Sequence, residues 1–165
     1  MGFGKHLSGA LRTMLYFAYG SNMDFGQMRK RCPSAITVTR ATLRGYQLAF
    51  TRFSESRQGG VADVVRQRGS VVEGVMYEIS DDDAARLDEY EGVADNCYRR
   101  IQVRVTLPAG EVMETYAYKA TEQGLFQPSK AYMQHLITGA KYHRLSPEYI
   151  GMLEAIQTAD AEPAK

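Results

Sequence analysis

The feature that most constrains the fold is residues 14–22, where an apolar segment leads directly into a Gly-Ser-Asn turn. The first four of these residues are apolar or aromatic, and the polar segment 24–31 that follows is compatible with a helix. The pattern predicts a buried strand, a tight loop, and a helix capped by Ser21 or Asn22. Consecutive backbone N–H groups in such a loop favour binding of an anionic ligand, and Gly20 lets the ligand approach the backbone closely because it has no Cβ. An ordinary strand–turn–helix corner is the alternative interpretation.

Most of the remaining apolar residues follow the two-residue period that is typical of β-strands. Residues 36–53 are expected to form two strands, with Gly45 producing a bend or bulge between them. Residues 68–70 are expected to connect two more strands, and Pro108-Ala109-Gly110 predicts the turn of a hairpin. The other expected strands cover residues 14–17, 61–66, 71–79, 98–107 and 112–120.

Capping residues indicate three further helices. Ser80 begins the first, the acidic residues 81–83 suit the positive end of its dipole, and Gly92 ends it. Because capping and the dipole explain this acidic run, we do not interpret it as a metal site. The other two helices are expected over residues 129–142 and 147–157.

These elements indicate one α+β domain of about six strands with surrounding helices, because a hairpin and a mixed element order do not suit a doubly wound sheet. We expect the domain to span residues 14–157. Residues 1–13 are expected to form a flexible leader, with Met14 as an alternative start, and residues 158–165 a frayed tail.

Composition argues against several classes of function. The formal net charge is +1 at pH 7, whereas nucleic-acid-binding proteins normally carry a basic excess, and we interpret the basic run 29–31 as a solvated helix end. No apolar run has the length of a membrane span, and no signal peptide is visible. The two cysteines and three histidines lack the spacing of a disulfide framework or of metal ligands. We therefore expect a cytoplasmic protein without nucleic acid, membrane or metal partners.

Three blocks of the sequence carry a family resemblance. They are Tyr16-Phe17-Ala18-Tyr19-Gly20-Ser21-Asn22, then Leu87-Asp88-Glu89-Tyr90-Glu91-Gly92-Val93, and finally Pro128-Ser129-Lys130-Ala131-Tyr132 with Gly139-Ala140 and Leu145-Ser146-Pro147-Glu148-Tyr149. In this order they resemble the γ-glutamylcyclotransferase family, also called AIG2-like. The resemblance implies a small, twisted, mixed β-barrel-like sheet with the loop after the first strand at its mouth. It also implies an enzyme that needs no cofactor.

The chemistry implied by the resemblance is intramolecular aminolysis of a γ-glutamyl amino acid or amine. The α-amino group of the substrate attacks its own γ-carbonyl, which gives 5-oxoproline and releases the amine. Glu91 corresponds to the general acid and base of the family, because it directly precedes a glycine. Burial would raise its pKa toward neutrality, as such a proton shuttle requires. The alternative interpretation is a solvated helix residue, like Glu89.

The resemblance also indicates which residues bind the substrate. The backbone of Tyr19, Gly20 and Ser21 would receive a carboxylate or the tetrahedral oxygen. Tyr116 is an alternative to Tyr118 as a pocket residue, and packing in the core is an alternative role for these strand tyrosines. The expected substrate-binding residues are Tyr16, Phe17, Ala18, Tyr19, Gly20, Ser21, Tyr98, Tyr118 and Tyr132.

The leaving group and the partners stay open at this point. The loop 54–60 matches nothing in the family and could set the specificity for the leaving group, although the form of residues 16–22 and Gly139-Ala140 is closest to the branch that acts on γ-glutamyl amino acids. Two other functions compete with the enzyme. One is a non-catalytic module that binds a small carboxylate or a protein, and the other is a cysteine hydrolase that uses Cys97 with a histidine. A homodimer is an alternative to a monomer.

Overall fold

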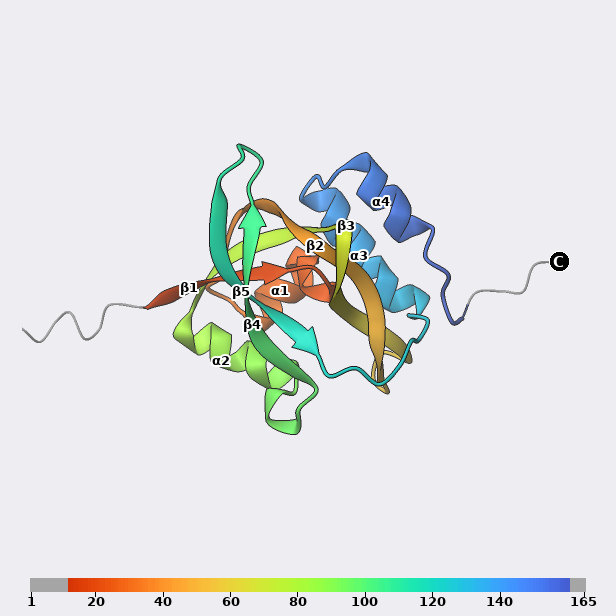
Figure 1. The fold of residues 1–165 in the computed structure, drawn as a ribbon. Helices are drawn as coiled ribbons and strands as arrows, with labels where there is room; N and C mark the ends of the chain where they lie inside the picture. Colours follow the sequence, from red (N-terminus) through yellow and green to blue (C-terminus); the bar gives the residue numbers. More distant parts are fainter. Residues whose placement is uncertain (1–11, 161–165) are drawn as a thin grey trace, which may run out of the picture.

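The computed structural model describes residues 12–160, which form a closed five-stranded barrel with helices around it (Figure 1). The strand order is β1–β3–β2–β4–β5, and a parallel contact between β1 and β5 closes the barrel while the other pairs are antiparallel. The predicted α+β class and the mixed barrel-like sheet are therefore confirmed. The strands are β1 (Thr13–Ala18), β2 (Ile36–Ser54), β3 (Gly59–Ser80), β4 (Tyr98–Thr106) and β5 (Val112–Ala120).

The strand number is five rather than about six, because β2 and β3 are each one long strand. The expected break at Gly45 is a bulge: this glycine has a φ of +81° and the register with β3 shifts between Arg44 and Tyr46. The expected connection at residues 68–70 lies in β3 opposite this bulge, and Gly69 has a φ of +85°. Bulges bend a strand without ending it, so one pair of strands serves two sides of the barrel.

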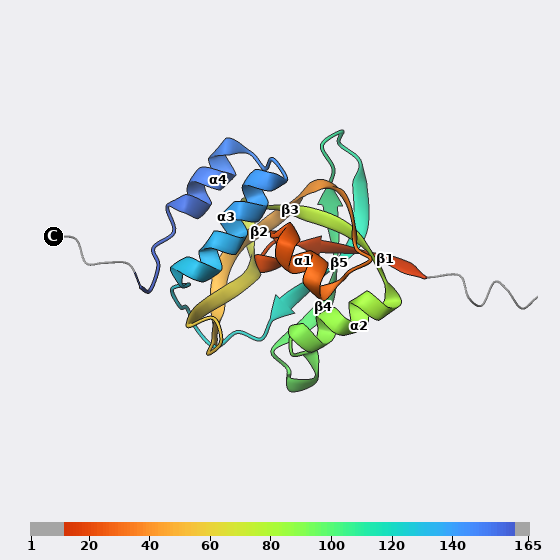
Figure 2. The same ribbon diagram turned by 180° about the vertical axis from the view of Figure 1, so that it is seen from behind.

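The helices lie on two sides of the barrel. Figures 1 and 2 show α3 and α4 together on one side, α2 on another, and α1 against the barrel between them. The side chain of Ser80 accepts a hydrogen bond from the N–H of Asp83, which confirms the predicted cap of α2. The cap of α1 is instead Asp24, because residues 21–23 form a short 3-10 turn. The helical segments are η2 (Ser21–Met23), α1 (Phe25–Arg31), α2 (Asp81–Tyr90), η3 (Val93–Asp95), α3 (Lys130–Tyr142) and α4 (Pro147–Glu154), the last shorter than expected.

The packing of α3 fixes the turn that follows β1. A Cβ added to Gly139 would lie 2.3 Å from the carbonyl carbon of Met23, so only a glycine allows this close approach of helix to turn. Met23 itself is completely buried. The turn η2 is therefore held from outside by α3 and from inside by the barrel.

A buried polar cluster joins three strands of the barrel. Asp63 of β3 has no exposed surface, and its Oδ1 accepts from the N–H groups of Val64 at 2.8 Å and Ala120 at 3.0 Å. Its Oδ2 accepts from Thr51 Oγ1 at 2.8 Å and from Lys119 Nζ at 2.7 Å. Every carboxylate oxygen thus has two donors, which is what a buried charge requires.

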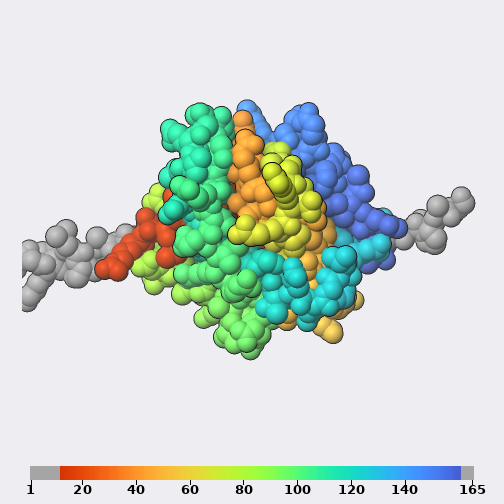
Figure 3. Space-filling model, in the orientation of Figure 1, coloured from red at the N-terminus to blue at the C-terminus, as the bar shows by residue number. Residues whose placement is uncertain are grey.

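Segment 121–127 connects β5 to α3 along the surface, where the space-filling view shows it below the yellow part of β3 (Figure 3). The N–H of Gln123 donates to the carbonyl of Thr51 at 2.7 Å, and the N–H of Phe126 donates to that of Phe50 at 2.9 Å. The segment is therefore tied to β2, and it places the first turn of α3 next to the strand ends.

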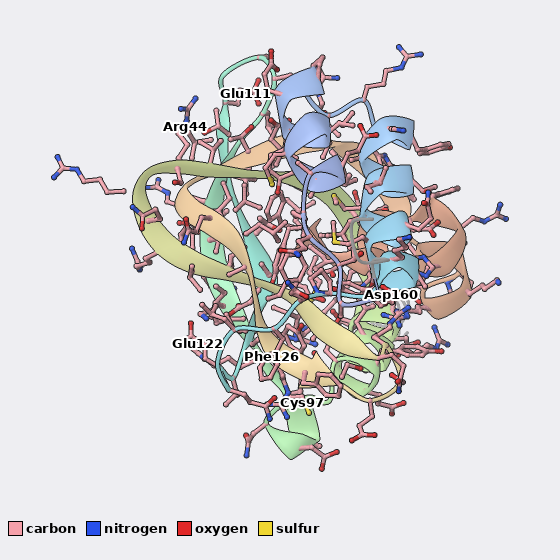
Figure 4. The ribbon with its side chains drawn as sticks, turned by 90° about the vertical axis from the view of Figure 1, so that its right-hand side faces the viewer. Arg44, Cys97, Glu111, Glu122, Phe126 and Asp160 are labelled. Atoms are coloured by element: carbon pink, nitrogen blue, oxygen red, sulfur yellow. The ribbon has the colours of Figure 1, made fainter. Side chains whose placement is uncertain are left out.

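The ends of the described chain are bonded to the fold. Thr13 begins β1, and the N–H of Ala159 donates to the carbonyl of Pro128 at 2.9 Å. Asp160 accepts from the N–H of Lys130 at 2.8 Å and lies beside the start of α3 (Figure 4). Thr13, Ala159 and Asp160, which were assigned to the leader and the tail, thus contact the domain, and the predicted bounds of leader, domain and tail stay predictions. The rest of the expected leader, 1–11, and of the tail, 161–165, lies outside the described residues. Among residues 12–160, no helix has the length and apolar character to cross a bilayer.

Candidate active site

An open pocket of about 490 Å³ lies where four segments meet. The first segment is the loop after β1, and the second is residues 52–57, at the end of β2 and in the loop that follows it. The third runs from Tyr90 to Tyr98, and the fourth is the first turn of α3. The loop after β1 thus lines a pocket, as the resemblance implied. Glu91, Gly20 and Ser21, which are far apart in the sequence, line it together.

Glu91 is placed at the pocket by the end of α2. Its N–H donates to the carbonyl of Leu87 at 2.8 Å, and Gly92 then turns the chain with a φ of +65°. A side chain at position 92 would be strained at this φ, and its Cβ would lie 2.9 Å from the sulfur of Cys97. The glycine after Glu91 is therefore required by backbone conformation and by space.

The carboxyl of Glu91 is half-buried, and its environment favours the neutral form. Burial raises the pKa of Glu91 to about 7, the nearby Arg31 and Arg57 oppose this shift, and Asp88 adds to it. A carboxyl group that titrates near neutral pH can both accept and return a proton.

The turn after β1 offers backbone donors to the pocket. Within η2, the N–H of Met23 donates to the carbonyl of Gly20 at 3.1 Å. In the part of the chain that the structure describes, the N–H groups of Gly20, Ser21 and Asn22 have no acceptor. A Cβ at Gly20 would lie 3.3 Å from Cβ of Ala62 and 3.4 Å from Oη of Tyr132. Glycine therefore leaves the space in front of these donors open for a ligand.

Asn22 is a site residue that the sequence analysis did not select, because it was interpreted as a helix cap. It is buried, and its Nδ2 donates to Oη of Tyr16 at 3.0 Å and to Oε1 of Glu91 at 3.5 Å. Its Oδ1 accepts from Gln27 Nε2 at 3.0 Å and from Arg31 Nη1 at 3.2 Å. Asn22 is thus fixed on both sides and links the turn to the carboxyl of Glu91.

Two of the predicted tyrosines are bonded to the backbone of Ala62, which also lines the pocket. The N–H of Ala62 donates to Oη of Tyr132 at 2.9 Å, and Oη of Tyr98 donates to the carbonyl of Ala62 at 2.7 Å. Tyr132 therefore keeps its own hydroxyl proton available to a ligand. Burial raises the pKa of Tyr132 to about 12, so this hydroxyl stays neutral at physiological pH. Tyr19 donates to the carbonyl of Tyr118, which joins the turn to β5.

The choice between Tyr116 and Tyr118 is resolved by the barrel. Tyr118 lines the pocket, and its hydroxyl donates to Oδ1 of Asp88 at 2.6 Å. Tyr116 does not line it; its ring lies 5.2 Å from that of Tyr16 and 4.9 Å from the guanidinium carbon of Arg100.

Phe17 and Ala18 were also expected to bind substrate; this stays a prediction, and the structure places both residues in the core. Neither residue lines the pocket, and neither has exposed surface. Successive strand residues face opposite sides, so Phe17 points away from the side of Tyr16, and its ring instead packs over Gly74. Tyr16, which was also expected, does line the pocket.

Three arginines line the pocket, and the sequence analysis had interpreted one of them differently. Arg31 was interpreted as part of a solvated helix end, but it lines the pocket and its guanidinium lies 4.5 Å from the centre of the Tyr90 ring. Arg52 and Arg57 line the pocket as well. Arg57 comes from the loop 54–60, which the sequence analysis had connected with specificity.

The alternative of a cysteine hydrolase finds no geometric support among residues 12–160. Cys97 lines the pocket and is labelled in Figure 4, but its sulfur is 3.4 Å from Nη2 of Arg52. His135 pairs with Asp24 at 2.6 Å, and His143 lies 3.1 Å from the carbonyl of Met23. Neither histidine lines the pocket. His6 lies outside the described residues.

A closed mixed barrel with a carboxyl group and a Gly-Ser-Asn turn in one pocket defines a small α+β protein with a candidate acid–base site. No group of potential metal ligands occurs among residues 12–160. The sequence model of the AIG2-like family matches residues 71–153. The chain belongs to the γ-glutamylcyclotransferase, or AIG2-like, family, as the resemblance predicted.

Individual relatives agree with this assignment. The γ-glutamylcyclotransferase of Mus musculus is 34% identical over 149 residues, which are 88% of this chain and 79% of that protein. The human γ-glutamylcyclotransferase is 33% identical over 90% of this chain and 81% of its own length. A solved structure titled γ-glutamyl cyclotransferase is 31% identical, covers 93% of both chains and has a TM-score of 0.88.

A more distant relative shows that the fold alone does not identify the leaving group. A γ-glutamyl cyclotransferase from yeast described as specific to glutathione has a TM-score of 0.60 at 16% identity, covering 86% of this chain and 93% of its own. At this identity the likeness concerns the fold. The leaving group must therefore be argued from the residues of the pocket.

Proposed function

We propose that this protein is a cofactor-free γ-glutamylcyclotransferase. It converts a γ-glutamyl amino acid or amine to 5-oxoproline and the released amine. The observation that carries the proposal is that the carboxyl of Glu91 shares one pocket with the backbone donors of Gly20 and Ser21. A non-catalytic binding module would not need a carboxyl group whose pKa is raised to about 7 in that place.

The reaction needs one proton shuttle. The carboxylate of Glu91 removes a proton from the substrate ammonium, and the free amine attacks the γ-carbonyl carbon to close a five-membered ring. The C–N bond to the leaving group then breaks as Glu91 returns this proton to the departing nitrogen, and the second proton of the attacking nitrogen passes to the released amine, so that the products are a neutral ring amide and an ammonium. Atoms balance without water, and Glu91 ends in its starting state. A positioned acid–base group contributes about 10²- to 10⁴-fold to such a rate.

The other pocket residues position the substrate. The backbone donors of Gly20 and Ser21 receive the glutamyl carboxylate or the developing oxyanion, where a single donor contributes about 3 kcal/mol in well-studied enzymes. Tyr132 has a free hydroxyl proton for the same purpose, and Asn22 orients Glu91. Holding the substrate in a folded conformation brings its amine to its own carbonyl, which supplies a further part of the acceleration.

The test is the product. The purified protein is incubated with γ-glutamyl-L-alanine, and 5-oxoproline and alanine are expected in equal amounts, with no glutamate. Glutamate in place of 5-oxoproline would indicate a hydrolase, and no turnover of any γ-glutamyl compound in a broad panel would leave the binding module as the better proposal. The cytoplasmic location and the homodimer stay predictions.

The pH dependence is expected to follow Glu91. The group must be ionised to accept the proton, and burial raises its pKa to about 7. We therefore expect kcat/KM to fall about tenfold per pH unit below this pKa. Initial rates of 5-oxoproline formation between pH 5 and 9 measure this limb. A fall in kcat/KM that begins only at the ordinary pKa of a glutamate would contradict the assignment. On the alkaline side, the pH dependence reports the pKa of the substrate ammonium.

A further inference from the structure

Three arginines bring positive charge to the pocket. Arg31, Arg52 and Arg57 are half-buried and line it. Within residues 12–160, none of them forms an ion pair with a carboxylate. Partial removal of a cation from water is unfavourable unless an anion compensates it. A ligand that brings a carboxylate would supply this compensation.

Arg31 and Arg57 are held side by side by one polar network. Arg57 Nη2 donates to Gln27 Oε1 at 2.8 Å, and Arg31 Nη1 donates to Asn22 Oδ1 at 3.2 Å. Gln27 Nε2 in turn donates to the same oxygen of Asn22 at 3.0 Å. Each guanidinium has five N–H donors, so both retain donors for a ligand. Burial and the charge of Arg31 lower the pKa of Arg57, which is the cost of keeping the two cations close together.

Arg52 is engaged differently. Its Nη1 donates to the carbonyl of Thr121 at 3.2 Å, and its Nη2 lies 3.4 Å from the sulfur of Cys97. It is bonded to Thr121 and Cys97 and takes no part in the Asn22–Gln27 network. The pair formed by Arg31 and Arg57 is therefore the better anion site.

The position of this pair relative to Glu91 indicates which anion it binds. Asn22 lies between Arg31 and Glu91, because its Oδ1 accepts from Arg31 Nη1 at 3.2 Å and its Nδ2 donates to Glu91 Oε1 at 3.5 Å, and the charges of Arg31 and Arg57 both act on the Glu91 carboxyl. If Glu91 protonates the departing nitrogen, the carbon bonded to that nitrogen also lies close to Glu91. In a γ-glutamyl amino acid this carbon carries a carboxylate, which Glu91 would repel unless cations stood beside both groups.

We propose that Arg57, with Arg31 beside it, binds the carboxylate of the leaving amino acid and so selects γ-glutamyl amino acids over γ-glutamyl amines. The proposal rests on the proposed function of the same pocket. Arg57 is the residue to test, because Arg31 also supports Asn22. A planar guanidinium can bind a carboxylate with two parallel hydrogen bonds, which a neutral carboxamide cannot match.

The experiment compares γ-glutamyl-L-alanine with γ-glutamyl-L-alaninamide, which differ only in this carboxylate. We expect the wild type to favour the acid in kcat/KM by about tenfold to a hundredfold. Arg57→Gln should remove this preference, with a larger rise in KM for the acid than for the amide, whereas any change in the pKa of Glu91 affects both compounds alike. Arg57→Lys should keep part of the preference. The control is Arg68→Gln, which removes the same charge from an exposed position outside the pocket.

Calorimetric binding of both compounds to the Glu91→Gln protein separates this inference from the proposed function. Tighter binding of the acid, lost on adding Arg57→Gln, supports the role of Arg57 even if no 5-oxoproline forms in the wild type. Equal binding of the two compounds, no binding of either, or an equal loss for both on Arg57→Gln would overturn it. A preference that Arg68→Gln also removes would mean that net charge, and not Arg57, is responsible.

Discussion

Replacing Glu91 by glutamine is expected to lower kcat for 5-oxoproline formation by about 10²- to 10⁴-fold, because the amide has nearly the same shape but cannot shuttle a proton. Glutamine can still accept the hydrogen bond from Asn22 and lie in the same pocket. The expected signature is therefore a loss in kcat with little change in substrate binding. Steady-state kinetics with γ-glutamyl-L-alanine measure it.

The matched control is Glu89→Gln. Glu89 lies on the same helix, is exposed and does not line the pocket. Its replacement should leave kcat within about twofold of the wild type, as expected of an exposed residue without a role. If Glu91→Gln retained full activity, Glu91 would not be the proton shuttle. If both variants lost activity equally, the effect would not be specific to the pocket.

Replacing Asp63 by alanine is expected to cost about 3–5 kcal/mol of unfolding free energy, the range measured when one partner of a buried ion pair is removed. Asp63 is completely buried and its two oxygens accept from four donors. Without it, two backbone N–H groups and the hydroxyl of Thr51 lose this acceptor, and the ammonium of Lys119 loses its buried partner. Urea unfolding followed by circular dichroism measures the loss.

The same lysine provides the control for Asp63. Lys119 Nζ also pairs with Glu122 at 3.2 Å, but the side chain of Glu122 is 56% exposed. Exposed pairs contribute about 0–1 kcal/mol, so Glu122→Ala should be nearly neutral. Similar costs for the two variants would mean that burial is not what makes Asp63 important.

Features governed by neighbouring residues were predictable from the sequence. The cap at Ser80 was correct, because a hydroxyl that accepts from an N–H three residues later depends only on local geometry. The bend or bulge at Gly45 was predicted correctly, but residues 36–53 were counted as two strands, whereas β2 runs through the bulge as one. A bulge and a strand end share the same glycine signal, and only the register with β3 distinguishes them.

The family resemblance named part of the candidate site, and for the other residues the prediction from the sequence was incomplete. The alternation of strand residues was a signal that Tyr16 and Phe17 face opposite sides, so that only one of these two side chains lines the pocket. No local signal separates Tyr116 from Tyr118, which lie two positions apart on one face. Asn22 and Arg31 were missed because their role arises from contacts with Gln27 and Glu91 that only the tertiary fold creates.

The half-buried carboxyl at the end of α2 also affects how firmly the chain stays folded. Its pKa is higher in the native protein than the ordinary 4.5, so between about pH 4.5 and 7 the folded chain holds more protons than the unfolded one. The free energy of unfolding must then decrease as pH rises through this interval, on the order of 2 kcal/mol with partial exposure allowed for. Denaturation curves at pH 5 and pH 8, with Glu91→Gln as reference, would reveal the difference. At low pH, where the protonated Glu91 weakens the native state least, the same group cannot act as the base and the enzyme is expected to be inactive.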